Sequence, residues 1–270
     1  MCYNVLDKRL TVLDRNRFVP EKHLSQNKTD TTSQETSPTK ATFLAHYPLF
    51  KDLSSQEIED LEHYITLLPC SAGRILYRPG ELATSLFLIQ SGCIQLYHLS
   101  TDGRKLVTAT FTADTCFGEL PLFYQGQHHS FAEAIEESTL YLISRHDIEH
   151  LLLQHSSLAF AFLHLLSQRF LQQETQLINA AFKSTSARLA SLLLELARPD
   201  EKAASHLEVV GLSHEELAER LGVYRETVSA ALRDLKGAGA ISLGRKKIIL
   251  QEPARLAAIA EAGNKGFRNT

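Results

Sequence analysis

The sequence lacks the features that mark several classes of protein. No stretch approaches the roughly 18 uninterrupted apolar residues that a membrane-spanning helix requires. The N-terminus has no basic segment followed by an apolar core, so we expect no secretory signal peptide. The four cysteines include no Cys-x-x-Cys pair, and a chain of 270 residues can bury a core without disulfide bonds. We therefore expect a cytoplasmic protein that does not span a membrane.

The chain also lacks an excess of positive charge. It carries 28 Lys and Arg residues against 31 Asp and Glu residues, and its formal net charge is −3. This balance excludes a uniformly basic surface, but it leaves room for a local basic patch. At about 150 residues per domain the length predicts two domains. The hydrophobic content of 44% and the charged content of 22% are ordinary for a globular chain.

Residues 1–42 have the composition of an appendage. Nine of the eighteen residues from Ser25 to Thr42 are Ser or Thr, and few are apolar. Such a segment cannot bury enough surface to offset the entropy lost on ordering. We predict a disordered N-terminal extension over residues 1–42.

Residues 43–156 show the pattern of a folded domain rich in strands. Ser54 and Glu57 have the spacing of a capping box, which predicts the start of a helix. Short β-rich runs then alternate with Gly turns as far as Ile143, and such a series indicates an antiparallel barrel or jelly roll. The expected strands are residues 74–77, 85–90, 93–99, 105–111, 131–134 and 139–143.

A long helix is expected after this domain, in a segment that we place at residues 157–183. A capping box of Ser144 and Asp147 opens the helical region, and apolar residues then recur at seven-residue spacing. This apolar seam favours a two-stranded contact in a homodimer, although it could instead pack on the chain's own barrel. The periodicity ends at residues 182–185, where we expect a hinge. The seam consists of Leu163, Leu166, Phe170 and Leu177.

The segment 214–233 matches a helix-turn-helix. We place this motif within a domain over residues 184–256 and expect a C-terminal tail over residues 257–270. Ser213 and Glu216 form a capping box for the first helix, and Gly222 falls where the tight turn needs a left-handed backbone. Small and apolar residues supply facing sides for the two helices. They are Leu217, Ala218, Leu221, Val223, Val228 and Ala231.

A wing is expected to follow the helix-turn-helix. Residues 240–250 have the pattern of a β-hairpin with a basic tip. Between residues 220 and 255, eight Lys and Arg residues face three Asp and Glu residues, a local charge of +5 that leaves −8 for the rest of the chain. The average charge therefore conceals a basic patch, as double-stranded DNA binding requires.

The second helix of the motif is the expected DNA-reading element, because the N-terminal residues of a recognition helix reach base edges in the major groove. Arg225 can donate two hydrogen bonds to guanine, and Glu226 can accept one from the amino group of cytosine. Arg233 lies further along and could reach a base or a phosphate. We assign base reading to Arg225, Glu226, Ser229 and Arg233. We assign backbone contacts to Tyr224, Thr227, Arg245, Lys246 and Lys247.

These motifs resemble those of the CRP/FNR transcription regulators over residues 43–256. The resemblance rests on residues 79–81, 91–92 and 117–123 in the barrel and on residues 221–229 in the reader segment. It implies an α+β protein with an antiparallel β jelly-roll sensor barrel, a long dimerisation helix and a C-terminal winged helix-turn-helix. It also implies a homodimer whose barrel senses a small-molecule effector, with RNA polymerase as a further partner. Activation and repression of target genes both stay open.

The effector pocket implied by the resemblance departs from that of cyclic-AMP-binding members. Gly118 and Glu119 match the positions that hold the amide and ribose contacts, but His129 stands where those members carry Arg. His is shorter than Arg and mostly neutral at pH 7, so it cannot replace the phosphate-binding fork. We therefore expect an effector other than cyclic AMP and leave any cofactor unknown. The implied pocket consists of Gly118, Glu119, Leu120, His129 and Ser130, with Gln173 and Glu174 where those members carry Thr-Ser.

Metal and redox sites find little support in the sequence. His128 and His129 are adjacent, but on a strand their side chains would point to opposite faces. Iron–sulfur members of the resembled family carry several N-terminal cysteines, whereas this chain has only Cys2 there. We predict no metal site, leave haem open, and expect Cys93 and Cys116 to be buried apolar fillers.

Two other functions stay open at this point. The barrel could be a ligand-binding module that regulates a partner protein, with the basic helix and wing incidental. Glu119 near His129 could suggest acid–base chemistry, but no nucleophile, metal cluster or phosphate-binding loop accompanies them. The sequence therefore favours a dimeric regulator that is not an enzyme. We expect it to read a pseudo-palindromic DNA operator whose half-site centres lie about 34–36 Å apart.

Overall fold

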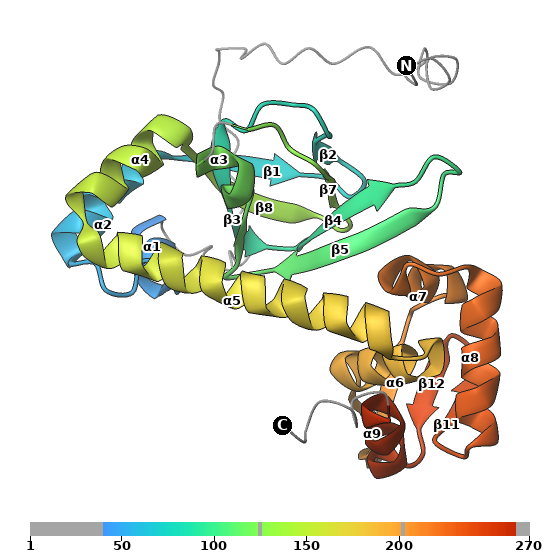
Figure 1. Ribbon diagram of the computed structural model, residues 1–270. Helices are drawn as coiled ribbons and strands as arrows, with labels where there is room; N and C mark the ends of the chain where they lie inside the picture. Colours follow the sequence, from blue (N-terminus) through green and yellow to red (C-terminus); the bar gives the residue numbers. More distant parts are fainter. Residues whose placement is uncertain (1–39, 124–125, 201–202, 263–270) are drawn as a thin grey trace, which may run out of the picture. The chain divides into compact units, whose positions relative to one another are not determined.

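The computed structural model describes residues 40–123, 126–200 and 203–262 (Figure 1). The predicted disordered extension lies outside the described residues up to position 39. The first described helix, α1 (Lys40–His46), begins three residues before the expected boundary at Phe43 and already buries Phe43 and Leu44.

The sensor domain is a jelly roll of two four-stranded antiparallel sheets. One sheet has the strand order β1-β8-β3-β6 and the other β2-β7-β4-β5. The six expected strands are confirmed, and two further strands, β1 and β6, were not anticipated. The strands are β1 (Ile65–Cys70), β2 (Ile75–Tyr77), β3 (Ser85–Ser91), β4 (Cys93–Leu99), β5 (Lys105–Thr112), β6 (Cys116–Phe117), β7 (Phe131–Ala134) and β8 (Ser138–Ser144).

Two layers of core stabilise this domain. Between the sheets, Ile89, Ile94, Phe117 and Leu140 are fully buried, and the ring of Phe117 stacks on Phe87 with the centroids 4.8 Å apart. A second cluster packs the helices α1, α2 (Ser55–Glu62), α4 (Arg145–Gln154) and the first turns of α5 (Ser156–Phe182) against the sheet that contains β1, β3 and β8. Each layer buries apolar area that supplies the main driving force for folding.

The helix starts follow the expected caps with one difference. Ser54 and Glu57 form the reciprocal capping box at α2. At α4 the Ser144 hydroxyl accepts the Asp147 N–H at 3.2 Å and donates to the Asp147 carboxylate at 2.5 Å. The Asp147 side chain thus bonds the hydroxyl rather than the Ser144 backbone, because an aspartate is one methylene shorter than the usual Glu partner.

The long helix α5 is confirmed at residues 156–182, one residue earlier than expected. Its first turns are buried through Leu158 and Phe162. Further along, Leu163, Phe170 and Leu177 are 58%, 71% and 70% exposed, and Leu166 is half-buried. Most of the predicted seam therefore does not pack on the chain's own barrel, which removes that alternative for these three residues.

The reader domain begins at Ser184, whose hydroxyl caps α6 (Thr185–Leu196), and its sheet has the order β11-β12-β10-β9. The helix-turn-helix and the wing are confirmed. Strands β9 and β10 were not predicted from the sequence. The remaining elements are β9 (Arg198–Asp200), β10 (Ala203–Val210), α7 (His214–Leu221), α8 (Arg225–Gly237), β11 (Ile241–Gly244), β12 (Lys247–Leu250) and α9 (Pro253–Glu261).

The placement of a C-terminal tail at residues 257–270 is wrong at its start. Helix α9 continues to Glu261 and buries Leu256 and Ala260 in the reader core, beside residues of α6. The apolar face of α9 continues past the expected boundary, so the domain includes at least residue 261. Over the part of the chain that the structure describes, no helix combines the length and apolar character needed to cross a bilayer.

Candidate nucleic-acid interface and sensor pocket

The helix-turn-helix is built from local signals that the structure confirms. The Ser213 hydroxyl accepts the Glu216 N–H at 3.1 Å, and the Glu216 carboxylate accepts the Ser213 N–H at 2.7 Å. This hydrogen bond from the Ser213 backbone lowers the pKa of Glu216. Gly222 ends α7 with φ of 65°, a left-handed conformation that costs Gly little.

Buried small and apolar residues fix the angle between the two helices. Leu217 and Val228 are fully buried, and Ala218 and Ala231 are nearly so. A further residue, Arg188 on α6, donates a hydrogen bond to the Leu221 carbonyl at the end of α7. Burial lowers the pKa of Arg188. The sequence does not predict this contact, because nothing in its pattern links residue 188 to a turn 33 residues later.

The recognition helix α8 presents most of its predicted reading residues to solvent. Arg225, Glu226 and Arg233 are exposed, as is Tyr224 at the start of the helix. Ser229 differs, because its hydroxyl lies 2.9 Å from Nδ1 of His214 and is hydrogen-bonded across the two helices. Its hydroxyl is therefore already engaged before any base is present. Thr227 is half-buried.

The wing divides its three basic residues between two environments. Arg245 and Lys246 occupy the exposed turn between β11 and β12, where Lys246 adopts a positive φ of 56°. Lys247 lies in β12, and its Nζ is 2.9 Å from Oε2 of Glu208 on β10. The tip of the wing therefore carries two available cations, while the charge of Lys247 is balanced within the domain.

The predicted sensor pocket centres on a buried glutamate. Gly118 has φ of 86°, and a Cβ added there would lie 3.0 Å from Cδ2 of Phe87, so this position requires glycine. Glu119, which is 1% exposed, begins α3 (Glu119–Phe123). Its Oε1 accepts a hydrogen bond from Nη1 of Arg169 on α5, and Nη2 of Arg169 donates to the Cys116 carbonyl.

Arg169, which lies on α5 and contacts both Glu119 and the Cys116 carbonyl, was not predicted from the sequence. Its guanidinium also lies 4.9 Å from the ring centroid of Phe111. Burial is the largest single influence on the pKa of Arg169 and would lower it, but the charge of Glu119, the hydrogen bond to its carboxylate and the other neighbouring groups together outweigh burial and raise the pKa. Its position could have identified it, because Arg169 lies four residues before Gln173 of the predicted pocket and therefore on the same face of α5.

The other predicted pocket residues differ in exposure. Leu120 is 62% exposed, and Gln173 and Glu174 are exposed on α5. His129 is exposed, whereas its neighbour His128 is buried and stacks on Tyr77 with the ring centroids 3.5 Å apart. Burial lowers the pKa of His128.

The remaining pocket features bear on the metal and redox predictions. Ser130 hydrogen-bonds the Tyr77 hydroxyl. Cys93 and Cys116 are buried as predicted, and burial raises the pKa of the Cys116 thiol to about 12. A thiol with so high a pKa is almost entirely protonated, whereas the thiolate is the reactive form. Within the described ranges, no group of three or more His, Cys, Asp and Glu residues could hold a metal ion.

Two protein-family models match the chain, one in each domain of the structure. A model of the cyclic nucleotide-binding domain matches residues 68–155, which cover the jelly roll from β1 to the end of α4. A model of the Crp-like helix-turn-helix domain matches residues 187–259, which cover the reader domain from α6 into α9. The two matches follow the same order as the domains of the structure.

Similar proteins align with nearly their whole length. The chain is 28% identical to the cyclic AMP receptor protein of Thermus thermophilus over 213 residues, 79% of this chain and 96% of that protein. It is 29% identical to the anaerobic regulatory protein of Bacillus subtilis over 215 residues, 78% of this chain and 90% of that protein. The solved structure of a CRP/FNR-family transcriptional regulator from Thermus thermophilus matches with a TM-score of 0.61 and 26% identity, over 73% of this chain and 100% of that one.

Proposed function

Because the chain belongs to the CRP/FNR family of transcriptional regulators, we propose that it works as a homodimer on a pseudo-palindromic DNA operator. The observation that carries this proposal is the recognition helix α8, which is held by a capped and glycine-turned helix-turn-helix. That helix presents Arg225, Glu226 and Arg233 to solvent. Arg225 and Glu226 lie in its first turn, which is the part that reaches base edges.

The dimer forms through α5. Leu163, Phe170 and Leu177 are each more than half exposed in the single chain, at the seven-residue spacing of a two-stranded helix contact. A second copy of α5 would cover these side chains and recover the apolar area that one chain leaves in water. The resulting two-fold symmetry requires two recognition helices about 34–36 Å apart on the DNA.

Backbone contacts come from residues around the recognition helix and at the wing tip. Arg245 and Lys246 supply the cations at the wing, and Tyr224 and Thr227 lie at the start of α8. Lys247 contributes less than the other two wing cations, because Glu208 balances its charge. Phosphate contacts of this kind set the affinity and its salt dependence but carry no base information.

The effector that regulates this binding is one other than cyclic AMP. His129 is an exposed imidazole where cyclic-AMP-binding members carry a guanidinium, and Oε1 of Glu119 already accepts from Arg169. A cyclic nucleotide would therefore find no guanidinium fork at position 129, and it could bind Oε1 of Glu119 only by displacing Arg169. RNA polymerase is the expected protein partner at the operator, and the protein works in the cytoplasm, where bacterial DNA lies.

Selection from random double-stranded DNA tests the proposal. The full-length protein should enrich a two-fold symmetric site, and Arg225→Ala should relax one base position in each half-site by about 1–3 kcal/mol. Lys246→Ala should weaken all sequences alike and flatten the salt dependence, whereas Lys51→Ala, which removes an exposed lysine from the sensor domain, should change neither. Failure to enrich any symmetric site, or equal and sequence-independent losses from Arg225→Ala and Lys246→Ala, would contradict the proposal.

A further inference from the structure

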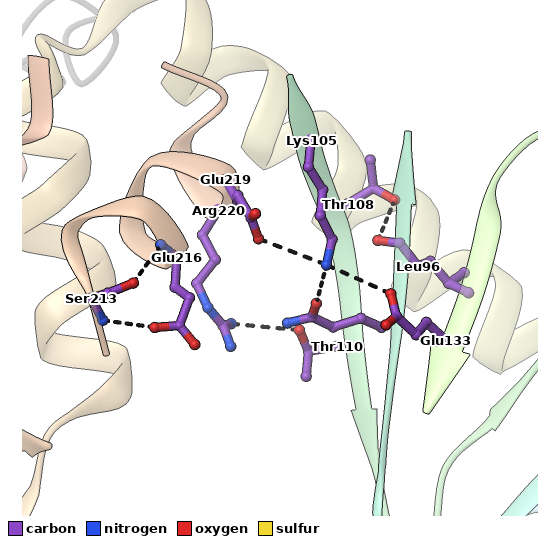
Figure 2. A network of polar contacts seen from close by, with 10 residues as sticks. Leu96, Lys105, Thr108, Thr110, Glu133, Ser213, Glu216, Glu219 and Arg220 are labelled. Carbon is purple, nitrogen blue, oxygen red and sulfur yellow. Dashed lines mark hydrogen bonds and ion pairs between the residues drawn. The ribbon is translucent and has the colours of Figure 1, made fainter. Parts of the chain in front are cut away.

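Lys105 lies at the centre of a polar network that joins the sensor domain to the first helix of the helix-turn-helix (Figure 2). Its Nζ is 3.7 Å from Oε2 of Glu219 on α7 and 3.8 Å from Oε2 of Glu133 on β7. It also donates to Oε1 of Gln95 at 3.2 Å and lies 4.4 Å from the ring centroid of Tyr97. One cation therefore serves two carboxylates that belong to different domains.

Three further contacts extend this network along β5 and the loop before it. Nη1 of Arg220 reaches Oγ1 of Thr110 at 3.5 Å, as Figure 2 shows. The guanidinium of Arg104 lies 4.5 Å from the ring centroid of Tyr224. Leu106 lies against the turn, because a Cβ added to Gly222 would be 2.9 Å from its Cδ1. We call this set the sensor–reader clasp; it consists of Arg104, Lys105, Leu106, Thr110, Glu133, Glu219, Arg220, Gly222 and Tyr224.

The ion pairs of the clasp are partly shielded from water. The side chains of Lys105, Glu219 and Glu133 are 22%, 24% and 26% exposed. Charges at this depth interact more strongly than an exposed surface pair, because less water screens them. The ion pairs of Lys105 therefore stabilise the contact between the two domains more than fully solvated side chains would.

The clasp leaves the reading surface open. It engages α7, the turn and Tyr224 at the N-cap of α8, while Arg225, Glu226 and Arg233 on α8 stay exposed to solvent. The sensor domain can therefore hold the reader domain while α8 lies in the major groove. A contact that blocked DNA binding would be expected to cover these three side chains, but the clasp leaves all three exposed.

We propose that Lys105 and Glu219 are positioning residues that hold the reader domain in its DNA-competent orientation. The hinge at Lys183 and Ser184 would otherwise let the reader domain reorient, and binding would have to order it at an entropic cost. Glu133 connects Lys105 to the predicted pocket, because it pairs with Lys105 and lies on β7, three residues after Ser130. The inference rests on the proposed function, because the ligand that it favours is DNA.

A matched pair of charge reversals on α7 tests the clasp in the full-length protein. Glu219→Lys places a second cation beside Lys105, whereas Glu215→Lys makes the same change at an exposed position of the same helix. Binding to the DNA site selected by the wild type should be about three- to tenfold weaker for Glu219→Lys than for Glu215→Lys. The base preference should be equal in both, because Arg225 and Glu226 are untouched.

A double-mutant cycle distinguishes positioning from a general loss of structure. Lys105→Met and Glu219→Gln, which are near-isosteric, should each weaken DNA binding, and the double variant should lose less than the sum. Lys105→Arg, which keeps the charge, should lose less affinity than Lys105→Met. Additive losses, or affinity for Glu219→Lys equal to or above that of Glu215→Lys, would overturn the inference while the wild type still binds its site. A wild type that selects no symmetric DNA would instead overturn the proposed function.

Discussion

Replacing Arg169 by Met would leave the carboxylate of Glu119 buried without its charge partner. Glu119 is 1% exposed, and among the described residues its Oε2 has no hydrogen-bond partner even with Arg169 in place. Removing one member of a buried ion pair typically costs about 3–5 kcal/mol, because the other charge stays in a poorly solvated site. We expect Arg169→Met to destabilise the sensor domain by an amount near the lower end of this range at pH 7.

Protonation sets an upper limit on this cost. Neutralising a carboxyl group of ordinary pKa, about 4.3, costs about 3.7 kcal/mol at pH 7, because each pH unit above the pKa corresponds to about 1.36 kcal/mol. The same protonation costs only about 1 kcal/mol at pH 5. In the variant, the carboxyl group would take up a proton on folding, so the folded state gains stability relative to the unfolded state as pH falls. The cost of the unpaired carboxylate in Arg169→Met should therefore be at most about 3.7 kcal/mol at pH 7 and at most about 1 kcal/mol at pH 5, so the effect of the substitution should shrink as the pH falls.

Urea denaturation at the two pH values measures this difference. The chain has 8 tyrosines and no tryptophan, so tyrosine fluorescence and circular dichroism are suitable signals, at one fixed protein concentration. The control is the double variant Glu119→Gln with Arg169→Met, which has neither charge and should recover part of the loss. A loss below about 1 kcal/mol at pH 7, or an equal loss at both pH values, would refute the reasoning.

Two further predictions concern the dimer and the buried imidazole. Phe170→Glu should convert the dimer to a monomer in sedimentation experiments, because it places a charge in the apolar seam, whereas Gln172→Glu on another face of α5 should leave the dimer intact. Persistence of a Phe170→Glu dimer would show that the seam is not the interface. His128→Phe keeps a ring against Tyr77 and removes a group whose pKa burial lowers, so its melting temperature should fall less than that of the wild type from pH 7 to pH 5. The sign follows because only unfolded chains take up this proton just below about pH 6.5, and parallel curves would contradict it.

Signals that act over a few residues were readable from the sequence. The capping boxes at Ser54 and Ser213 and the left-handed turn at Gly222 depend on residues no more than a few positions apart, and the structure confirms all three. Apart from the two-residue strand β6, the strands between residues 75 and 144 follow from alternating composition and intervening turns. These features predict element type because backbone hydrogen bonding and local sterics decide them.

The elements that were missed depend on tertiary context. Strand β1 contains Pro69, which weakens any prediction of a strand, but β1 lies at the edge of its sheet, where a missing N–H is tolerated. Strand β10 exists because it pairs with β12, the second strand of the wing hairpin. Helix α9 continues to Glu261 because the reader core offers a surface for Leu256 and Ala260. No window of a dozen residues contains that information.

Side-chain partners were the least predictable part of the candidate site. Glu119 and Arg169 are 50 positions apart, and only the packing of α5 beside the jelly roll brings them together. Gly118 and Glu119 could be identified from their motif, but the motif gives no sign that a guanidinium already engages the carboxylate. The family resemblance pointed to Gly118 and Glu119, and the structure showed which side chain contacts Glu119.

The same limit applies to the charge that attracts DNA. Eight basic residues lie between positions 220 and 255, but three of them are engaged elsewhere in the structure. Arg220 reaches Thr110 of the sensor domain, Lys247 pairs with Glu208, and Arg255 donates to the Ala238 carbonyl at 2.7 Å. A phosphate can recruit these cations only by displacing such partners, whereas the exposed Arg225, Arg233, Lys236, Arg245 and Lys246 have no such cost. The basic patch therefore divides into exposed cations, which we expect to bind DNA, and cations that already contact other parts of the protein, and a count from the sequence cannot separate the two.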